Sequence, residues 1–170
     1  MDPVDAGLLV LRLAIGLTFA AHGAQKAFGW WGGPGWERWR GAMLGMGFRP
    51  ASLFATLSIG AELVGGVCLA LGLVTAVAAA VLAAQSVVII LKVHAPHGFW
   101  NRSEGIEFPL ALGLSAIAIE LTGPGRLSLD AAAGFEPPAG VRAILLLAGV
   151  AGGVLTIALA ETSDRPAASR

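Results

Sequence analysis

The chain has 170 residues, of which 56% are hydrophobic and 13% charged, and its mean hydropathy is +0.76. A soluble bundle of buried helices is the alternative, but this chain carries more apolar surface than a soluble domain of its size could bury. The formal net charge is zero, so no electrostatic argument favours nucleic acid as a partner. The composition therefore predicts an all-α, polytopic helical bundle whose partner is the lipid bilayer.

Five apolar runs approach the roughly 20 residues that a membrane-spanning helix needs. They cover residues 7–28, 52–71, 75–92, 106–121 and 141–160, within a single domain of residues 1–160. The start of the chain is acidic rather than basic, so we expect the first run to stay in the protein and not to be a signal peptide. The polar residues 161–170 predict a disordered tail.

The connection after the first span contains a short amphipathic segment. Trp36, Trp39, Met43 and Met46 recur at helical spacing, which predicts a helix lying in the membrane interface. Further on, Gly72–Thr75 is short enough to join the second and third spans as an antiparallel hairpin.

Small residues recur at helical spacing in two of the spans. Gly149-x-x-x-Gly153 in the last span and Ala61-x-x-x-Gly65 in the second allow helices to approach closely. The contact can lie within the bundle or between two copies of the chain, so a homo-oligomer stays open. The lone cysteine, Cys68, excludes a disulfide within the chain and is expected to be a small core residue.

A polar and aromatic break, residues 92–109, separates the third span from the fourth. Counting spans places this break on the same membrane side as the loop of residues 29–50, and the two segments hold all five tryptophans. An ordinary belt of interfacial aromatics should appear on both sides, so the one-sided arrangement favours a site. Lysine and arginine are also more numerous on this side, which predicts that it is cytoplasmic.

Ionisable side chains inside spans are costly unless they are paired or hydrated. At 1.5 Å per residue, Arg12 and Glu120 come to a similar depth near the N-terminal side, where they can form an ion pair, although Arg12 could instead reach the headgroups. Glu62 and Gln85 both come near the middle of the membrane on adjacent spans. We expect Glu62 to face the bundle interior and to be hydrogen-bonded, with Gln85 as the partner.

A second set of polar residues comes to one level near the tryptophan-rich side, namely His22, Lys26, Lys92, His94 and Glu107. They predict a pocket beside His22 that is lined by His22, Lys26, His94 and Glu107 and roofed by Trp30, Trp31 or Trp100. Histidine and carboxylate suit proton exchange, and cations with aromatics suit a ring that carries carbonyl or anionic oxygens, such as a quinone. The candidate catalytic residues are Glu62, His22 and Glu107. The candidate ligand-binding residues are Lys26, Lys92, His94, Trp30, Trp31, Trp100, Asn101 and Gln85.

A metal site is the weaker alternative for the same break. His94-x-x-His97 with Glu104 or Glu107 offers ligands, but proline and glycine interrupt the spacing and nearby lysines would repel a cation. No bound metal and no covalently attached cofactor is expected.

Several motifs together resemble the DoxX family of small bacterial membrane proteins. They are Arg12-Leu, His22-Gly-x-x-Lys26-x-Phe-Gly-Trp-Trp-Gly-Gly, Glu62-Leu-x-Gly-Gly66, Gly72-Leu-x-Thr75, His94-x-Pro-x-Gly-Phe-Trp-Asn101, Gly105-x-Glu-Phe-Pro109 and Leu121-Thr-Gly-Pro-Gly-Arg-Leu-Ser-Leu-Asp130. The resemblance covers about residues 7–131 and implies a four-helix core in a bacterial inner membrane. The fifth span departs from the family pattern.

The resemblance also implies candidate functions. The family is named for the small membrane subunit of a thiosulfate:quinone oxidoreductase, and other members are linked to redox stress. One expectation is a quinone-linked oxidoreductase subunit or accessory protein that receives electrons from a partner subunit, because this chain has no haem, flavin or iron–sulfur motif. The alternative is a non-catalytic membrane scaffold or a carrier of a lipid or small molecule.

Overall fold

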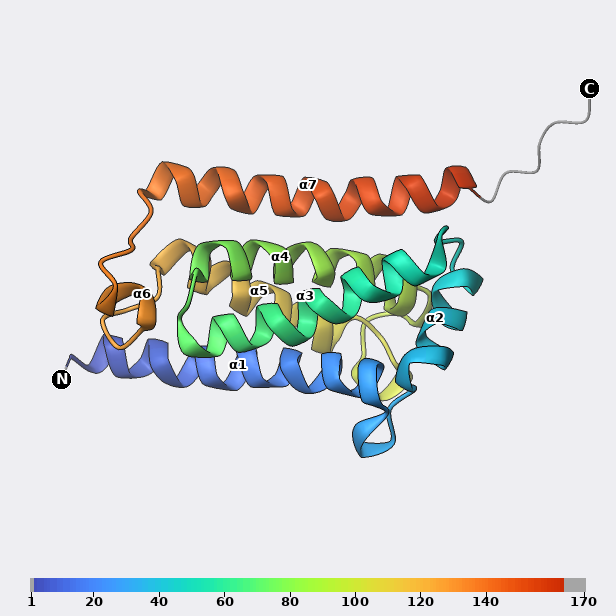
Figure 1. Cartoon of the computed structure of the whole chain (residues 1–170), viewed down its shortest axis with the longest axis horizontal. Coiled ribbons are helices and arrows are strands. Elements are labelled where there is room, and N and C mark those ends of the chain that lie inside the picture. The colour runs from blue at the N-terminus through green and yellow to red at the C-terminus, as the bar shows by residue number, and fades with distance from the viewer. Residues whose placement is uncertain (1, 164–170) are drawn as a thin grey trace, which may run out of the picture.

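The computed structural model describes residues 2–163, and every regular element in that range is a helix. The longer helices run side by side along one axis (Figure 1). The α-helices are α1 (Pro3–Phe28), α2 (Gly35–Gly45), α3 (Ala51–Leu71), α4 (Thr75–Ile89), α5 (Glu107–Thr122), α6 (Leu129–Ala132) and α7 (Ala139–Ser163). Short helical turns add Trp30–Gly32, Ile90–His94, Ala95–His97 and Asn101–Ser103.

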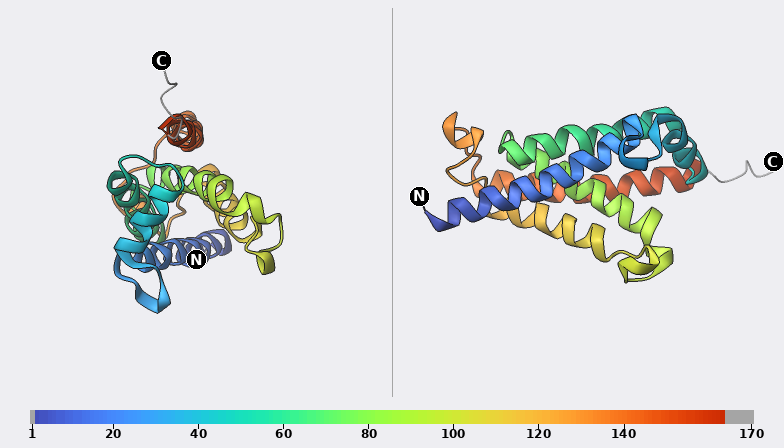
Figure 2. Two further views of the ribbon diagram at one scale, coloured as in Figure 1. Left: turned by 90° about the vertical axis from the view of Figure 1, so that its right-hand side faces the viewer. Right: turned by 90° about the horizontal axis from the view of Figure 1, so that it is seen from below.

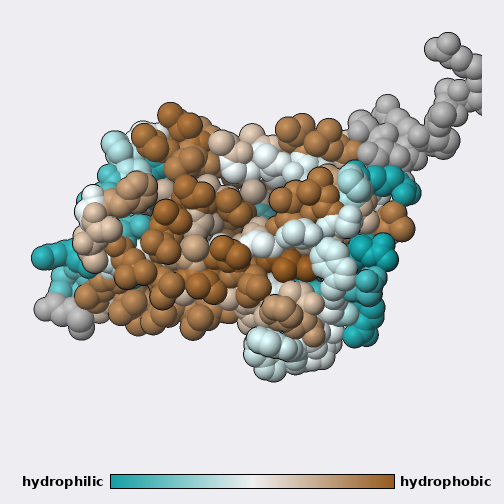
Figure 3. Space-filling model, viewed as in Figure 1, coloured by the Kyte–Doolittle hydropathy of each residue, from teal (hydrophilic) through white to brown (hydrophobic). Residues whose placement is uncertain are grey.

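Four helical segments of the described chain are long and apolar enough to cross a membrane, namely Pro3–Phe28, Ala51–Leu71, Thr75–His97 and Ala139–Ala160. Apolar side chains cover the middle of the face seen in Figure 3, and hydrophilic ones gather toward its two ends. The predicted all-α membrane bundle is confirmed. The remaining predicted span coincides with α5, whose 16 residues extend only about 24 Å at 1.5 Å per residue. Its crossing of the membrane stays a prediction.

The core of the bundle is formed by α1, α3, α4 and α5 around buried apolar side chains such as Phe19, Leu69, Leu82 and Ile119. Glycines let α1 approach α3 closely. A Cβ built on Gly16 would lie 2.5 Å from the carbonyl oxygen of Gly66, so neither helix can carry a larger residue there without moving. Cys68 is a free thiol that packs against this core.

Helix α7 lies outside the four-helix core and runs along α4 (Figures 1 and 2). A Cβ on Gly149 would clash with the carbonyl oxygen of Ala80, and a Cβ on Gly153 would lie 2.7 Å from that of Ala84. The small-residue motif is therefore used within the chain, and association of two copies through another face stays a prediction. Helix α7 also continues past the predicted boundary at residue 160. Most of the predicted tail, residues 164–170, lies outside the described residues.

The turn between α3 and α4 is stabilised by Asp130, which is distant in the sequence. Gly72 ends α3 with φ +65°, a left-handed conformation that suits glycine. The carboxylate of Asp130 then accepts hydrogen bonds from the backbone N–H groups of Val74 at 2.7 Å and Thr75 at 2.8 Å. Asp130 thus caps α4 from 55 residues away, and the predicted antiparallel hairpin is confirmed.

The predicted ion pair of Arg12 with Glu120 is wrong. Arg12 is fully buried; it donates to the backbone carbonyl of Leu127 and interacts electrostatically with Asp130. Its complete burial also rules out the predicted alternative of reaching the headgroups. Glu120 interacts electrostatically with Arg142 instead. The physical reason is that the connection after α5 folds over the α3–α4 turn and brings its own carbonyl and carboxylate groups to Arg12.

The two tryptophan-containing connections, residues 29–50 and 95–105, lie at the same end of the bundle, opposite the N-terminus (Figure 1). The predicted amphipathic helix is confirmed as α2, and its position in the membrane interface stays a prediction. It is more than a surface helix, because Met43 is buried and Trp36 and Trp39 pack against a cluster containing Phe48 and Ala51. This contact folds α2 over the end of the bundle. The cytoplasmic location of this end stays a prediction.

Candidate functional site

A cavity of about 160 Å³ lies beneath α2 at the tryptophan-rich end, between the four core helices. We call it the polar cavity. The lining side chains that carry a polar atom are His22, Lys26, Trp39, Glu62, Ser86 and His94, and Phe19 and Phe108 are among the apolar ones. Three of the side chains predicted to share one level, His22, Lys26 and His94, therefore line one cavity, and Glu62 joins them.

A buried ion pair forms one wall of the polar cavity. The Lys26 ammonium donates to Glu62 Oε1 at 2.5 Å, and the two side chains are 11% and 1% exposed. Helical side chains lean toward the N-terminus of their own helix. Because α1 and α3 are antiparallel, Lys26 leans down into the bundle and Glu62 leans up toward the tryptophan-rich end, so the two charges meet.

Glu62 also belongs to a hydrogen-bond chain that leads across to α4. Gln85 Nε2 donates to Glu62 Oε1 at 3.2 Å and to Ser58 Oγ at 2.7 Å. The predicted interior position of Glu62 and its bond to Gln85 are confirmed. The chain of groups from Lys26 through Glu62 and Gln85 to Ser58 therefore spans three helices.

Trp39 covers the polar cavity from α2. Its ring centroid lies 4.2 Å from the Lys26 ammonium, a cation–π contact that adds to the ion pair. The buried Trp39 Nε1 has no hydrogen-bond partner among the described residues, and neither has the buried Glu62 Oε2. The protein therefore leaves one hydrogen-bond donor and one acceptor on cavity-lining side chains without a partner. In native structures such buried groups usually bond to a ligand or to ordered water.

The two histidines enter the cavity lining from α1 and from the end of α4. His94 Nδ1 bonds the carbonyl oxygen of Glu104 at 2.5 Å, and because a carbonyl only accepts, Nδ1 carries a proton. Proton exchange by His94 is then left to Nε2. His22 packs its ring against Phe108 at 5.8 Å between centroids and bonds the side chain of Gln25.

A π-helical turn, Ile90–His94, sets the positions at the end of α4. Such turns shift the register of a helix and are frequent at functional sites. Here His94 lines the polar cavity, Lys92 lines a neighbouring apolar one, and Val93 lines both. The predicted end of the span at residue 92 missed this turn, which has no distinctive composition.

The structure does not bring Glu107 into the polar cavity, so its predicted place beside His22 is wrong. Glu107 Oε2 accepts a hydrogen bond from the backbone N–H of Asn101 at 2.9 Å, which fixes the loop before α5. With Trp100 and Arg102, Glu107 instead lines an open cavity of about 350 Å³. Depth along a helix axis does not give the direction of a side chain, so counting residues could not place Glu107.

The predicted aromatic roof is also different. Trp30, Trp31 and Trp100 are 54%, 70% and 58% exposed and do not line the polar cavity. Trp30 packs on Phe28, and Trp100 packs on its neighbour in the loop. The roof is Trp39, which the sequence placed only on the apolar face of an interfacial helix.

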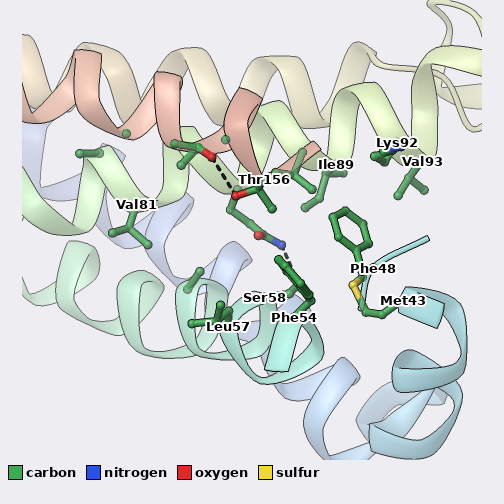
Figure 4. A pocket seen from close by; sticks show the side chains of 18 of the residues that line it. Met43, Phe48, Phe54, Leu57, Ser58, Val81, Ile89, Lys92, Val93 and Thr156 are labelled. Carbon is green, nitrogen blue, oxygen red and sulfur yellow. Dashed lines mark hydrogen bonds between the residues drawn. The ribbon is translucent and has the colours of Figure 1, made fainter. Parts of the chain in front are cut away.

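The second cavity, which we call the apolar cavity, is larger, at about 420 Å³, and lies between α3, α4 and α7 (Figure 4). Lys92, predicted for the polar cluster, lines this cavity instead. Gln85 lines it too and so connects it to Glu62 of the polar cavity.

Among the described residues no group of three histidine, cysteine, aspartate or glutamate side chains converges to hold a metal ion. In the alternative ligand set, His97 Nδ1 bonds the carbonyl oxygen of Val93 at 3.1 Å. His94 and His97 are therefore each engaged with a different backbone carbonyl.

Comparison with known proteins places the chain in a family. Residues 7–95 match the family model described as DoxX. Over 135 residues the chain is 33% identical to the Uncharacterized membrane protein Rv3486 of Mycobacterium tuberculosis, covering 72% of this chain and 78% of that protein. No solved structure matches the chain. The matched region contains most of α1, all of α2, α3 and α4, and the turn after α4, and it includes His22, Lys26, Glu62 and His94. This integral membrane protein belongs to the DoxX family.

Proposed function

We propose that this protein binds the ring of a quinone in its polar cavity and acts as the membrane subunit or accessory protein of a quinone-linked oxidoreductase in a bacterial inner membrane. The observation that carries the proposal is that two side chains lining that cavity each keep a buried atom without a protein partner, the Trp39 Nε1 donor and the Glu62 Oε2 acceptor. An apolar ligand would satisfy neither atom.

The chemistry of a quinone and its reduced quinol supports this choice. A quinone carbonyl can accept a hydrogen bond from Trp39 Nε1 or from Lys26, and a quinol hydroxyl can donate to Glu62 Oε2. A cavity of about 150 Å³ accommodates one six-membered ring, and the polar cavity has about 160 Å³. The cavity thus fits a single ring with oxygens at its edge.

Reduction of a quinone to a quinol takes two electrons and two protons. The sequence has no haem, flavin or iron–sulfur motif, and its single cysteine cannot supply the thiolates of a cluster, so in this proposal a partner subunit that holds the redox cofactor supplies the electrons. The role of this chain is to hold the ring and exchange protons at its oxygens. His94 Nε2 and His22 are the groups suited to that exchange near neutral pH.

A second candidate is a non-catalytic carrier or scaffold. The apolar cavity favours it, because a carrier of lipids needs room for a chain and no proton-exchanging group. Turnover separates the candidates. A carrier binds quinone but does not stimulate quinone reduction by a partner dehydrogenase, whereas the subunit does both.

The binding test uses the protein in lipid nanodiscs, titrated with a simple benzoquinone. Trp39→Phe keeps the ring and removes the N–H, and His22→Ala removes a lining group; each should weaken binding about tenfold, the effect of one hydrogen bond of about 1.4 kcal/mol. The matched controls are Trp36→Phe in the same helix and His97→Ala in the nearby loop, neither of which lines the polar cavity. If all four variants bind the benzoquinone with the same affinity as the wild type, the proposal is wrong.

A further inference from the structure

We propose that the apolar cavity holds the hydrocarbon tail of the ligand whose ring lies in the polar cavity, so that the natural ligand is a tailed, membrane-resident quinone of the isoprenoid class. This inference rests on the proposed function. It adds a second binding region on α3, α4 and α7, and it assigns a role to α7, the helix outside the four-helix core.

The lining of the apolar cavity suits a hydrocarbon chain. Its volume of about 420 Å³ lies within the range of small-molecule pockets. Two polar side chains on its wall are engaged by protein partners, because Gln85 donates to Ser58 at 2.7 Å and Thr156 donates to the carbonyl oxygen of Gly152 at 2.8 Å (Figure 4). Most of the remaining lining is aliphatic or aromatic, and such a surface gains most from an apolar occupant.

The two cavities share a wall. Trp39, Ile89 and Val93 line both of them, and Gln85 on the apolar side donates to Glu62 on the polar side. A ligand whose ring lies against Trp39 can therefore pass its tail around Ile89 and Val93 without crossing the core of the bundle. Two unrelated occupants would have to pack against the same three side chains.

The apolar cavity lies where a tail could enter from the bilayer. Leu57 of α3 lines it and is 57% exposed, on the surface that faces lipid. From the other side it is lined by α7, where Gly149, Gly152 and Gly153 contribute no side chain to fill it. The space thus lies between two helices whose outer faces contact acyl chains.

The test uses a variant in which Trp39 is the only tryptophan, with Trp30, Trp31, Trp36 and Trp100 replaced by phenylalanine. Because Trp39 lines both cavities, quenching of its fluorescence in nanodiscs reports a quinone bound in either of them. Two probes are compared, a benzoquinone ring without a tail and the same ring with a ten-carbon tail. Comparison between variants in identical nanodiscs removes the effect of tail partitioning into lipid.

The blocking substitution is Gly152→Leu, which fills the apolar cavity from α7. A Cβ at Gly152 meets nothing within 4 Å, so the side chain enters open space and the helix is preserved. The matched control is Gly140→Leu on the same helix, also with nothing within 4 Å but outside the cavity lining. Gly152→Leu should weaken binding of the tailed quinone about tenfold or more and leave the tail-free ring unchanged, since several buried CH₂ groups are lost.

Other results separate the two proposals. If both quinones bind and Gly152→Leu weakens neither, the tail lies elsewhere and this inference is overturned while the proposed function stands. If neither quinone binds, both proposals fall. If the ring does not bind but an isoprenoid alcohol displaces the tailed quinone from wild type and not from Gly152→Leu, the cavity is a site for lipid chains and the quinone function is overturned.

Discussion

Lys26 of α1 and Glu62 of α3 form an ion pair at 2.5 Å in the bundle interior, where the glutamate side chain is 1% exposed. The pair lies at the centre of the candidate site. Trp39 stacks over the lysine, Gln85 donates to the carboxylate, and the polar cavity opens beside both charges. Two charges are thus retained in the interior, where an ion pair is costly unless its partners are close and hydrogen-bonded.

Replacing one partner of this ion pair should destabilise the protein more than replacing both. A buried charge left without its partner typically costs about 3–5 kcal/mol, whereas replacing both partners by apolar residues is often neutral. Lys26→Met should therefore lower the thermal midpoint strongly, and Lys26→Met with Glu62→Leu should recover most of the loss. A double variant as unstable as the single one would show that the pair's hydrogen bonds, rather than its charges, hold α1 on α3.

The cap that Asp130 provides to α4 should contribute measurably to stability. Asp130→Ala removes two hydrogen bonds from the backbone to a carboxylate that is 3% exposed, and we expect a loss of about 1–2 kcal/mol. Asp2→Ala is the control, because Asp2 caps α1 through one bond to Val4 in an exposed position. Thermal melts in one detergent compare the two, and an equal loss would mean that the remote cap has no special role.

The seating of α7 on α4 should depend on Gly153. In Gly153→Leu the new side chain would meet the carbonyl oxygen of Ala84, at 2.7 Å from the Cβ alone, and overpacking of this kind costs about 1–3 kcal/mol. Gly140→Leu, near the start of the same helix, should melt like the wild type. Should both variants melt alike, α7 does not pack on α4 through its glycines.

Membrane topology can be tested by cysteine labelling in a Cys68→Ala background. Single cysteines replace Trp30, Asn101 and Gly134, all of which are exposed. A membrane-impermeant maleimide should label the Trp30 and Asn101 positions from one side of oriented vesicles and the Gly134 position from the other. Labelling of all three from one side would show that the 16 residues of α5 do not cross the membrane.

The sequence predicted the helices well because the apolar runs, the glycine turn and the spacing of Met43 with the tryptophans are local signals. It also found the depth of Glu62 and its partner Gln85. It missed the Lys26–Glu62 pair, because counting residues placed Lys26 at the membrane edge. The opposite lean of side chains on antiparallel helices was the signal that could have joined them.

Other features of the site depend on tertiary contacts that no local pattern specifies. Trp39 reaches Lys26 only because α2 folds over the start of α3, a contact made by Phe48 and its neighbours. Glu107 does not point toward His22, because its carboxylate accepts a hydrogen bond from the backbone N–H of Asn101 in the preceding loop. Arg12 does not pair with Glu120 for the same kind of reason, because the carbonyl group of Leu127 is close enough to accept its hydrogen bond.

The most direct measurement is a crystal structure of the protein in a lipidic mesophase containing a brominated benzoquinone, with the bromine located by its anomalous signal. We predict a bromine peak in the polar cavity, with ring oxygens within hydrogen-bonding distance of Trp39 Nε1 and of Lys26 or Glu62. Ordered water satisfying both Trp39 Nε1 and Glu62 Oε2, with no bromine peak near His22, would contradict the proposed function.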